Sequence, residues 1–561
     1  MREALLKATL LIVVLPATIL GCDFKRFESL PKDMLVTAVV SDPRTFNPVL
    51  ANETSSTDVL DPVFAGLTRV DPYTFKVEPE LAGSWTISTD RKVVTMDLRR
   101  DVYFSDGKPF SADDVVFTFK VIYSPEVLSS FRDLFTLGGR QIKVEKVDDH
   151  TVRFILPVPF YPFLESLSIP ILPAHVLRKP LLEDLFERTW NIMTPPGQIV
   201  GLGPYVMTSY VPSQYILLKA NPYYYGRDGK GVRLPYIKRR AILIVQNQDA
   251  QYVKFISGET DIYSPRPQEI APLESMGKRR HFIVKEIGLD TGIMFISFNR
   301  NPAHYRRGGK TDPRYRWFTN PYFLRAVAHS IDKQGIIDDV YRGYGEPAVS
   351  FIPRNVPVYH LDMPDYAYSL DRARTLLEKG GFHWSNGILY DGAGNRVEFD
   401  FFTNSGNEQR ERIASIVLSD LTKLGMKVNY KPLDFNTLVE KLTSNFDWDC
   451  VLIALTGGYE PHDGANVLLS SGMLHLWDPA EKVPATPWEA EIDRLMTKGA
   501  EEYDIEKRAI YYKKVQKILH DELPLIPIVR QDDFVAYTDR LEGYRPTVFG
   551  NYRPEMMRLK R

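Results

Sequence analysis

The stretch KVVTMDLRRDVYFSDGKPFSADDVVFTFK, residues 92–120, decides the class of fold. Apolar residues alternate with polar ones over 94–98, which is the period of a strand with one buried face. Residues 105–108 supply a turn, because Gly107 accepts positive φ. Ser111 is predicted to cap a helix that carries Asp113 and Asp114 in its first turn. These residues predict a hairpin-like strand pair running into a capped helix, and nothing catalytic.

Helix and strand patterns alternate through the rest of the chain. The continuous apolar run at residues 450–455, which includes Cys450, is typical of a strand buried on both faces. Repeated helix-then-strand order predicts an α/β fold, and 561 residues are too many for a single core. Further strands are expected at 34–40, 428–430 and 524–529, and helices are expected at about 408–424 and 505–519, with caps predicted at Thr319, Asp332, Asp371 and Asp504.

The beginning of the chain has the pattern of an export signal. Arg2 and Lys7 precede an apolar run at 8–20, which is too short to span a bilayer. The end of this run resembles a lipobox, so residues 1–21 are expected to be a lipoprotein signal peptide and Cys22 the lipidated residue. The alternative is an ordinary signal peptide followed by a chance cysteine.

Eight positions of the opening stretch match a segment written "DG.pf.A.DV.f". In this the chain resembles the family 5 extracellular solute-binding proteins, the peptide, dipeptide and nickel receptors of ABC importers. Residues 79–85, 171–177, 201–205, 221–226 and 325–333 resemble further elements of that family. The matching positions are Asp106, Gly107, Pro109, Phe110, Ala112, Asp114, Val115 and Phe117.

The resemblance implies a two-lobed, periplasmic-binding-protein-like α/β fold. The fold implied is that of the type II solute-binding proteins, with mixed sheets and an extra subdomain in the first lobe. Lobe I is expected to comprise residues 22–286 and 525–561, with the inserted subdomain at about 55–195, and lobe II residues 287–524. The C-terminus would then return to complete the first lobe.

The resemblance also implies where a ligand binds. In peptide-binding relatives the loop after the buried strand carries an aspartate for the ligand's α-amine, and the matching position here is Gly458. Glu460 or Asp463 is expected to replace it, or else merely to rim the loop. Residues 50–55 correspond to a strand that bonds the ligand backbone. The predicted ligand-binding residues are Asn52, Glu53, Thr54, Thr456, Gly457, Gly458, Tyr459, Glu460 and Asp463.

The sequence lacks the motifs of common hydrolases and metal sites. It has no G-x-S-x-G, no H-E-x-x-H and no paired C-x-x-C. His462 and His475 suggest the nickel-binding branch of the family. No histidines are paired at the spacing of metal ligands, however, so we expect these two to be surface residues. We therefore predict no enzyme, no cofactor and no metal. The formal net charge of −1 gives no indication of a basic surface that would bind nucleic acid.

The predicted function is that of a substrate-binding lipoprotein of an ABC transporter. It would capture an oligopeptide or dipeptide between two lobes and deliver it to a membrane permease and its ATPase. We expect a monomer, anchored through its lipid in the periplasm or on the outer face of the cytoplasmic membrane. One alternative is a receptor for a non-peptide solute such as a nickel chelate or an oligosaccharide. From a different class, the alternatives are an exported hydrolase and a non-transport sensor.

Overall fold

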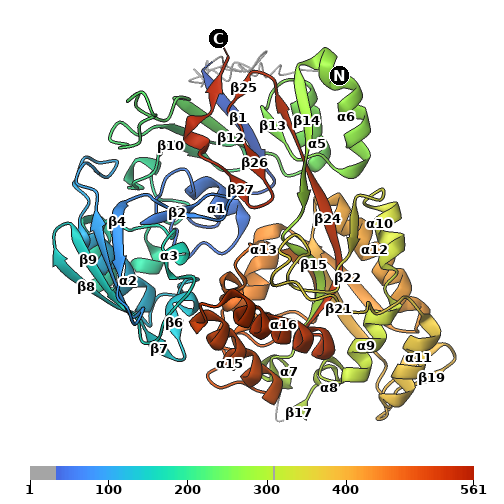
Figure 1. Ribbon diagram of the computed structural model, residues 1–561. Coiled ribbons are helices and arrows are strands. Elements are labelled where there is room, and N and C mark those ends of the chain that lie inside the picture. The colour runs from blue at the N-terminus through green and yellow to red at the C-terminus, as the bar shows by residue number, and fades with distance from the viewer. Residues whose placement is uncertain (1–32, 308–309, 561) are drawn as a thin grey trace, which may run out of the picture.

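The computed structural model describes residues 33–307 and 310–560 (Figure 1). The predicted signal peptide and Cys22 lie outside the described residues. None of the helices in this described part is both long enough and apolar enough to cross a bilayer.

Two four-stranded sheets build the N-terminal lobe (Figure 1). The first sheet is mixed, because its edge strand β1 runs parallel to its neighbour β12, while the other neighbouring pairs are antiparallel. The second is antiparallel throughout. In sheet order the strands are β1 (Met34–Val39), β12 (Arg239–Ile244), β11 (Tyr215–Ala220) and β10 (Tyr205–Val211), then β4 (Ala82–Ile87), β5 (Val93–Leu98), β9 (Thr151–Ile155) and β8 (Lys143–Asp148).

The opening stretch folds as a strand, a turn and a helix. It forms β5, a turn at 104–108 with Gly107 at φ +84°, and α2 (Ala112–Tyr123) with Ser111 as its N-cap residue. The predicted strand pair at the turn is reduced to a single bridge between Tyr103 and Pro109. Strand β5 pairs instead with β4 and β9, which come from elsewhere in the chain.

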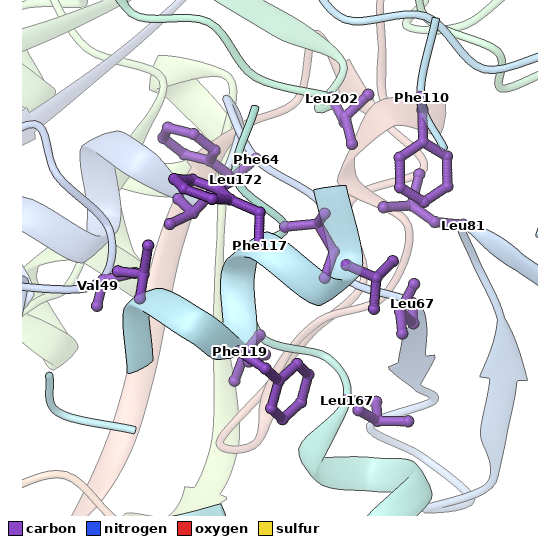
Figure 2. Close-up of a cluster of buried hydrophobic side chains, with 14 of the residues drawn as sticks. Val49, Phe64, Leu67, Leu81, Phe110, Phe117, Phe119, Leu167, Leu172 and Leu202 are labelled. Carbon is purple, nitrogen blue, oxygen red and sulfur yellow. The ribbon is translucent and has the colours of Figure 1, made fainter. Parts of the chain in front are cut away.

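Helix α2 lies at the centre of the N-terminal core (Figure 2). Its Phe119 ring contacts Phe135 and Phe154 edge-on, with centroids 4.9 and 5.5 Å apart. Asp114, which is 4% exposed, ties the helix to its surroundings. One carboxylate oxygen accepts from the Ser111 backbone N–H and the other from that of Ala174, each at 2.9 Å. A carboxylate in the first turn thus joins α2 to the start of α4 (Ala174–Leu182).

An eight-stranded sheet runs through the C-terminal lobe and into the N-terminal one (Figure 1). Strand β23 is buried on both faces as predicted: Cys450 and Leu452 pack into one core cluster, and Val451 and Ile453 into another. The path of the sheet is β13 (Ile262–Tyr263), β24 (Leu525–Thr538), β15 (Ile293–Phe298), β23 (Cys450–Leu455), β21 (Glu398–Asn404) and β22 (Lys427–Leu433), with β14 (Phe282–Leu289) and β18 (Gly345–Pro347) also paired to β24.

Strand β24 passes from one lobe to the other. Residues 525–529 pair with β15, whereas residues 532–538 pair with β14. The predicted return at residue 525 coincides with the first residue of β24, and the change of partner comes inside the strand. The lobe boundaries stated above stay a prediction. Beyond β24, the C-terminal segment packs on β1, where the Arg540 guanidinium donates to the Met34 carbonyl.

The predicted helices form, but two of their caps were wrong. Thr319 ends α8, and the side chain of Asn320 caps α9. Likewise Ser369 caps α11, and Asp371 lies in the first turn. Asp332 and Asp504 cap their helices as predicted. The helices packed around the eight-stranded sheet are α8 (Pro313–Phe318), α9 (Pro321–Ser330), α10 (Lys333–Asp339), α11 (Leu370–Lys379), α12 (Glu408–Lys423), α13 (Phe435–Glu440), α14 (Ala465–Leu468), α15 (Pro487–Glu501) and α16 (Ile505–Glu522).

The role of Asp114 can be measured against that of its neighbour. Asp114→Ala leaves two backbone N–H groups without acceptors, so it should lower the free energy of unfolding by about 2–3 kcal/mol. Asp113→Ala removes only an exposed pair with Lys146 and should stay within about 0.5 kcal/mol of the wild type. Urea denaturation followed by fluorescence provides both values, and equal losses would contradict the assignment.

Candidate ligand-binding site

A cavity of about 770 Å³ lies between the lobes. Its wall combines the start of α1 (Thr54–Leu60), the crossing strands β14, β15 and β24, the first turn of α12, the end of β23 and a hairpin near the C-terminus. A pocket of this size suits a small-molecule or short-peptide ligand. The lobes supply different sides of the same cavity, so a ligand there would contact both.

Charged groups are concentrated where the chain crosses between lobes. Asp290 and Asp533 line the cavity from the two crossing segments. Burial raises the pKa of Asp290, and burial together with the charge of Asp290 raises the pKa of Asp533 to about 7. Arg530 precedes Asp533 on the same strand, but its guanidinium donates to the carbonyls of Gly292, Ser350 and Phe351 and not to either acid. Arg530 therefore braces the crossing.

Arg410 is the cavity's second arginine, and it comes from the first turn of α12. Its Nη1 donates to the Asn404 side-chain oxygen at 2.7 Å, and its Nε has no hydrogen-bond partner. No carboxylate of the described residues forms an ion pair with it. Burial lowers its pKa to about 10, which means that the cation lacks solvation. An anionic group of a ligand would compensate this charge.

The predicted residues of the first lobe line the cavity, but residues 50–55 do not form the expected strand. Asn52, Glu53 and Thr54 are all in the wall. Glu53 immediately precedes α1, and its carboxylate accepts from Ser55 and Ser56, which draws this segment into a helix start. The Asn52 side-chain oxygen is buried without a hydrogen-bond partner.

The loop after β23 begins in the cavity wall and leads out of it. Thr456 lines the cavity, whereas the residues from Gly457 to Asp463 do not. Gly457 fits because a Cβ there would lie 2.1 Å from the Thr291 carbonyl oxygen. Gly458 is less crowded, although a Cβ there would lie 3.2 Å from a carboxyl oxygen of Asp463, a tight contact with the end of a side chain. Asp463 thus places its carboxyl group beside the position from which a side chain at residue 458 would project.

Glu460 is occupied by an internal partner. Its carboxylate forms a two-pronged ion pair with Arg508, with 2.9 Å between Oε2 and Nη1, and the two side chains are 2% and 0% exposed. Arg508 also donates to the Gly499 carbonyl and packs against the rings of Tyr161 and Tyr512. This pairing leaves Glu460 little capacity to bind a ligand's amine.

Asp463 faces a carboxylate of the opposite lobe. It is accessible to solvent, but the protein around it and the charge of Glu460 raise its pKa to about 8. Burial and the charge of Asp463 raise the pKa of Glu165 to about 9. A cation bound between these two acids would favour their ionised forms and lower both pKa values.

Aromatic rings from both lobes make contact next to the loop after β23. The Tyr459 ring stacks on Phe75 of the N-terminal lobe, with centroids 4.3 Å apart. The expectation that His462 and His475 are surface groups was wrong, because they are 2% and 0% exposed. Burial and the charge of Arg508 lower the pKa of His462 to about 3, so its imidazole is neutral.

Sequence reasoning missed Arg410, Glu165 and the acids of the crossing. A signal for Arg410 existed, because β21 and β23 are neighbouring parallel strands whose following loops meet at one edge. Glu165 had no comparable signal, since it lies far from the β23 loop in sequence and in another lobe.

Comparison with known proteins places this geometry in a family. Residues 76–472 match the sequence profile of "Bacterial extracellular solute-binding proteins, family 5 Middle". A probable ABC transporter-binding protein of Deinococcus radiodurans is 29% identical over 535 residues, covering 90% of this chain and 88% of that protein. The oligopeptide-binding protein AppA of Bacillus subtilis is 25% identical over 523 residues, covering 91% and 88%.

Solved structures share the fold. AppA of B. subtilis in complex with a nonapeptide has a TM-score of 0.82 at 24% identity, covering 94% of this chain and 99% of that one. NikZ of Campylobacter jejuni in complex with Ni(L-His) has a TM-score of 0.76 at 23% identity, covering 92% and 96%. The predicted two-lobed type II fold is confirmed.

The internal pairing of Glu460 has a measurable consequence. Glu460→Gln leaves the Arg508 guanidinium buried and uncompensated, so it should cost about 3–5 kcal/mol of unfolding free energy. Asp463→Asn should leave stability near that of the wild type, because Asp463 lacks such a pair. Thermal and urea unfolding of the unliganded protein measure both variants, and a stable Glu460→Gln protein would refute the structural role of Glu460.

Proposed function

Because this chain belongs to the bacterial extracellular solute-binding proteins of family 5, we propose that its interlobe cavity captures a peptide with a free α-amine. The peptide would extend from the cavity along the loop after β23, with its ammonium group against Asp463 and its carboxylate toward Arg410. Oligopeptide binding by AppA supports the substrate class.

The observation that carries the proposal is the position of the Asp463 carboxylate. It lies beside Gly458, the position where peptide-binding relatives carry the aspartate for the amine. Glu165 adds a second acid from the opposite lobe, so an ammonium group placed between them would be held by both lobes. Of the two candidates for the missing acid, Asp463 is favoured because Arg508 already neutralises Glu460.

The opposite end of a peptide needs a cation and hydrogen-bonding groups. Arg410 has no acidic partner among the described residues, and the Asn52 oxygen is also unpaired. A zwitterionic peptide would therefore compensate the Arg410 cation with its carboxylate and stabilise the ionised form of Asp463 with its ammonium group. A chelate or an oligosaccharide would leave the Asp463 and Glu165 pair without an ammonium group.

Ligand capture is proposed to proceed by closure of the lobes about the crossing strands. A ligand held by both lobes binds the closed state better than the open one. Shifting a 1:99 population to 99:1 takes about 5.5 kcal/mol of such differential affinity. The proposal includes delivery to a separate permease and ATPase, anchorage through Cys22 and no catalytic step in this chain.

The free amine should matter to binding. A peptide that raises the thermal unfolding temperature should lose about 10- to 100-fold in affinity when it is N-acetylated, because a charged hydrogen bond is lost. Asp463→Asn should abolish this difference, whereas Asp533→Asn, in the cavity floor, should retain it. If no peptide from a broad pool protects the protein against thermal unfolding, the proposal fails.

Binding of the amine should depend on pH. An acid with a pKa of about 8 is mostly protonated at pH 6, so capture of an ammonium group must release its proton. Affinity should thus rise close to tenfold per pH unit below pH 7, and it should fall again above about pH 8, where the peptide's own α-ammonium group loses its proton. Calorimetry in buffers of different ionisation enthalpy measures the released proton, and its absence at pH 6.5 would argue against Asp463.

Arg410 should act on the other end of the peptide. Arg410→Gln should weaken a free peptide about 10- to 100-fold and bind the C-terminally amidated peptide as the wild type does. Arg412→Gln is the matched control, because Arg412 lies two residues further along the same helix and does not line the cavity. Equal losses for both peptides would indicate that Arg410 only shapes the cavity.

A further inference from the structure

Three side chains outside the cavity lie close together. Two come from the loop at 470–486, between α14 and α15, and the third comes from the first turn of α15. They are His475, Glu481 and Glu489, and one nitrogen or oxygen atom of each lies within 4.8 Å of the others. His475 and Glu489 are 0% and 3% exposed, and Glu481 is half-buried. Buried polar groups in such numbers ordinarily have hydrogen-bond partners.

The imidazole of His475 is oriented for coordination. Its Nδ1 lies 3.0 Å from the Val467 carbonyl oxygen, which can only accept, so Nδ1 carries the proton. In the neutral imidazole Nε2 then presents a lone pair, and this atom is buried without a hydrogen-bond partner. A carbonyl that fixes the tautomer from behind is the usual support of a metal-ligating histidine.

The spacing also fits an ion better than a direct bond. His475 Nε2 and Glu489 Oε1 are 3.7 Å apart, too far for a hydrogen bond. Two ligands at about 2.1 Å from a tetrahedral Zn²⁺ are separated by about 3.4 Å. The observed separation is close to that of two ligands on one ion.

Hydrogen bonds hold both carboxylates in place, and Glu481 keeps one oxygen without a partner. Glu481 Oε2 accepts from the Ala485 N–H, while its Oε1 is buried without a partner. Glu489 accepts from Trp477 Nε1 at 2.9 Å and from Thr486 Oγ1 at 2.6 Å. No lysine or arginine in the described part of the chain forms an ion pair with either glutamate.

The nearby Arg300 does not neutralise the glutamates. It influences Glu489 at longer range, but its Nη2 donates to the carbonyls of Glu522 and Leu523. Asp478 lies within hydrogen-bonding distance of Glu481 and adds a further acid to the cluster. Among the described residues, His475 in its protonated form is thus the cation nearest to Glu489, and no lysine or arginine takes that place.

We propose that His475, Glu481 and Glu489 bind one divalent transition-metal cation of the Zn²⁺ class, with Asp478 or water completing the coordination. One imidazole and two carboxylates suit such a cation better than Mg²⁺ or Ca²⁺, which prefer oxygen ligands alone. The sequence predicted no metal, because the three ligands come from a loop and a helix without a recognised spacing.

The position of the ion indicates a structural role. None of its three ligands lines the cavity, but Leu474 and Leu476, the neighbours of His475, do. An ion between this loop and α15 would fix the part of the cavity wall that these two leucines form. The metal would therefore be a resident of the C-terminal lobe, distinct from any solute in the cavity.

The test uses Zn²⁺ alone, without peptide, on the purified chain after chelator treatment. Calorimetry should find one Zn²⁺ per chain, and Zn²⁺ should raise the thermal unfolding temperature. Glu481→Gln should weaken Zn²⁺ at least about 100-fold and lose the thermal response. Glu502→Gln, a half-buried glutamate outside the cluster, is the matched control and should behave as the wild type. Because Glu481 is only half-buried, its amide variant is expected to fold.

Two results would overturn the site. One is the absence of stoichiometric Zn²⁺ binding by the wild-type chain. The other is a Glu481→Gln chain that binds Zn²⁺ as tightly as the control. Anomalous scattering at the zinc edge from crystals of the loaded protein should place the ion between His475 and Glu489, and a peak in the interlobe cavity alone would also refute the assignment.

Discussion

The hydrogen bonds of β24 are the constraint on which the rest of the structure depends. This one strand pairs with β15 in the C-terminal lobe and with β14 in the N-terminal lobe, so its backbone bonds set the relation of the two. Arg530 lies at the point where β24 changes its pairing partner, and its side chain donates to three backbone carbonyls. The proposed closure of the lobes would therefore be confined to the few residues of the crossing, which lie in the cavity wall.

Desolvation decides which charged groups of the cleft are ready for a ligand. Glu460 and Arg508 are deeply buried, but they satisfy each other and act as part of the framework. Asp463, Glu165 and Arg410 also have pKa values shifted by the protein around them, yet they form no ion pair with a residue in the described part of the chain. This difference in pairing, rather than in residue type, separates structural charge from charge that a zwitterionic ligand would stabilise.

The wall of the cavity includes irregular backbone, and such segments are normally the most mobile parts of a binding site. The loop at 470–486 contains no helix or strand and places two leucines in the cavity wall, and turn-type backbone hydrogen bonds hold it. A cation held by His475 and the two glutamates would add coordinate bonds to these. Solute recognition and metal binding would then be separate functions of one lobe, joined by two apolar side chains.

Much of this architecture was readable from local sequence. The alternation over 93–98, the cap at Ser111 and the apolar run at 450–455 predicted β5, α2 and β23, because each depends on residues a few positions apart. The same local signals led to the family resemblance and the two-lobed fold. Where two polar residues competed for a cap, as at Thr319 and Asn320, sequence alone chose wrongly, since the preceding helix decides which one is free.

The candidate site was readable only in part. The loop after β23 was located from sequence, and its Glu460 and Asp463 were equivalent there. Only the tertiary structure distinguished them, because Arg508 comes from a helix 48 residues further along and neutralises Glu460. Arg410, Glu165 and the buried His475 likewise acquire their significance from neighbours that folding brings together. Sequence determines short-range geometry, whereas the pairing or isolation of a buried charge depends on packing between distant segments.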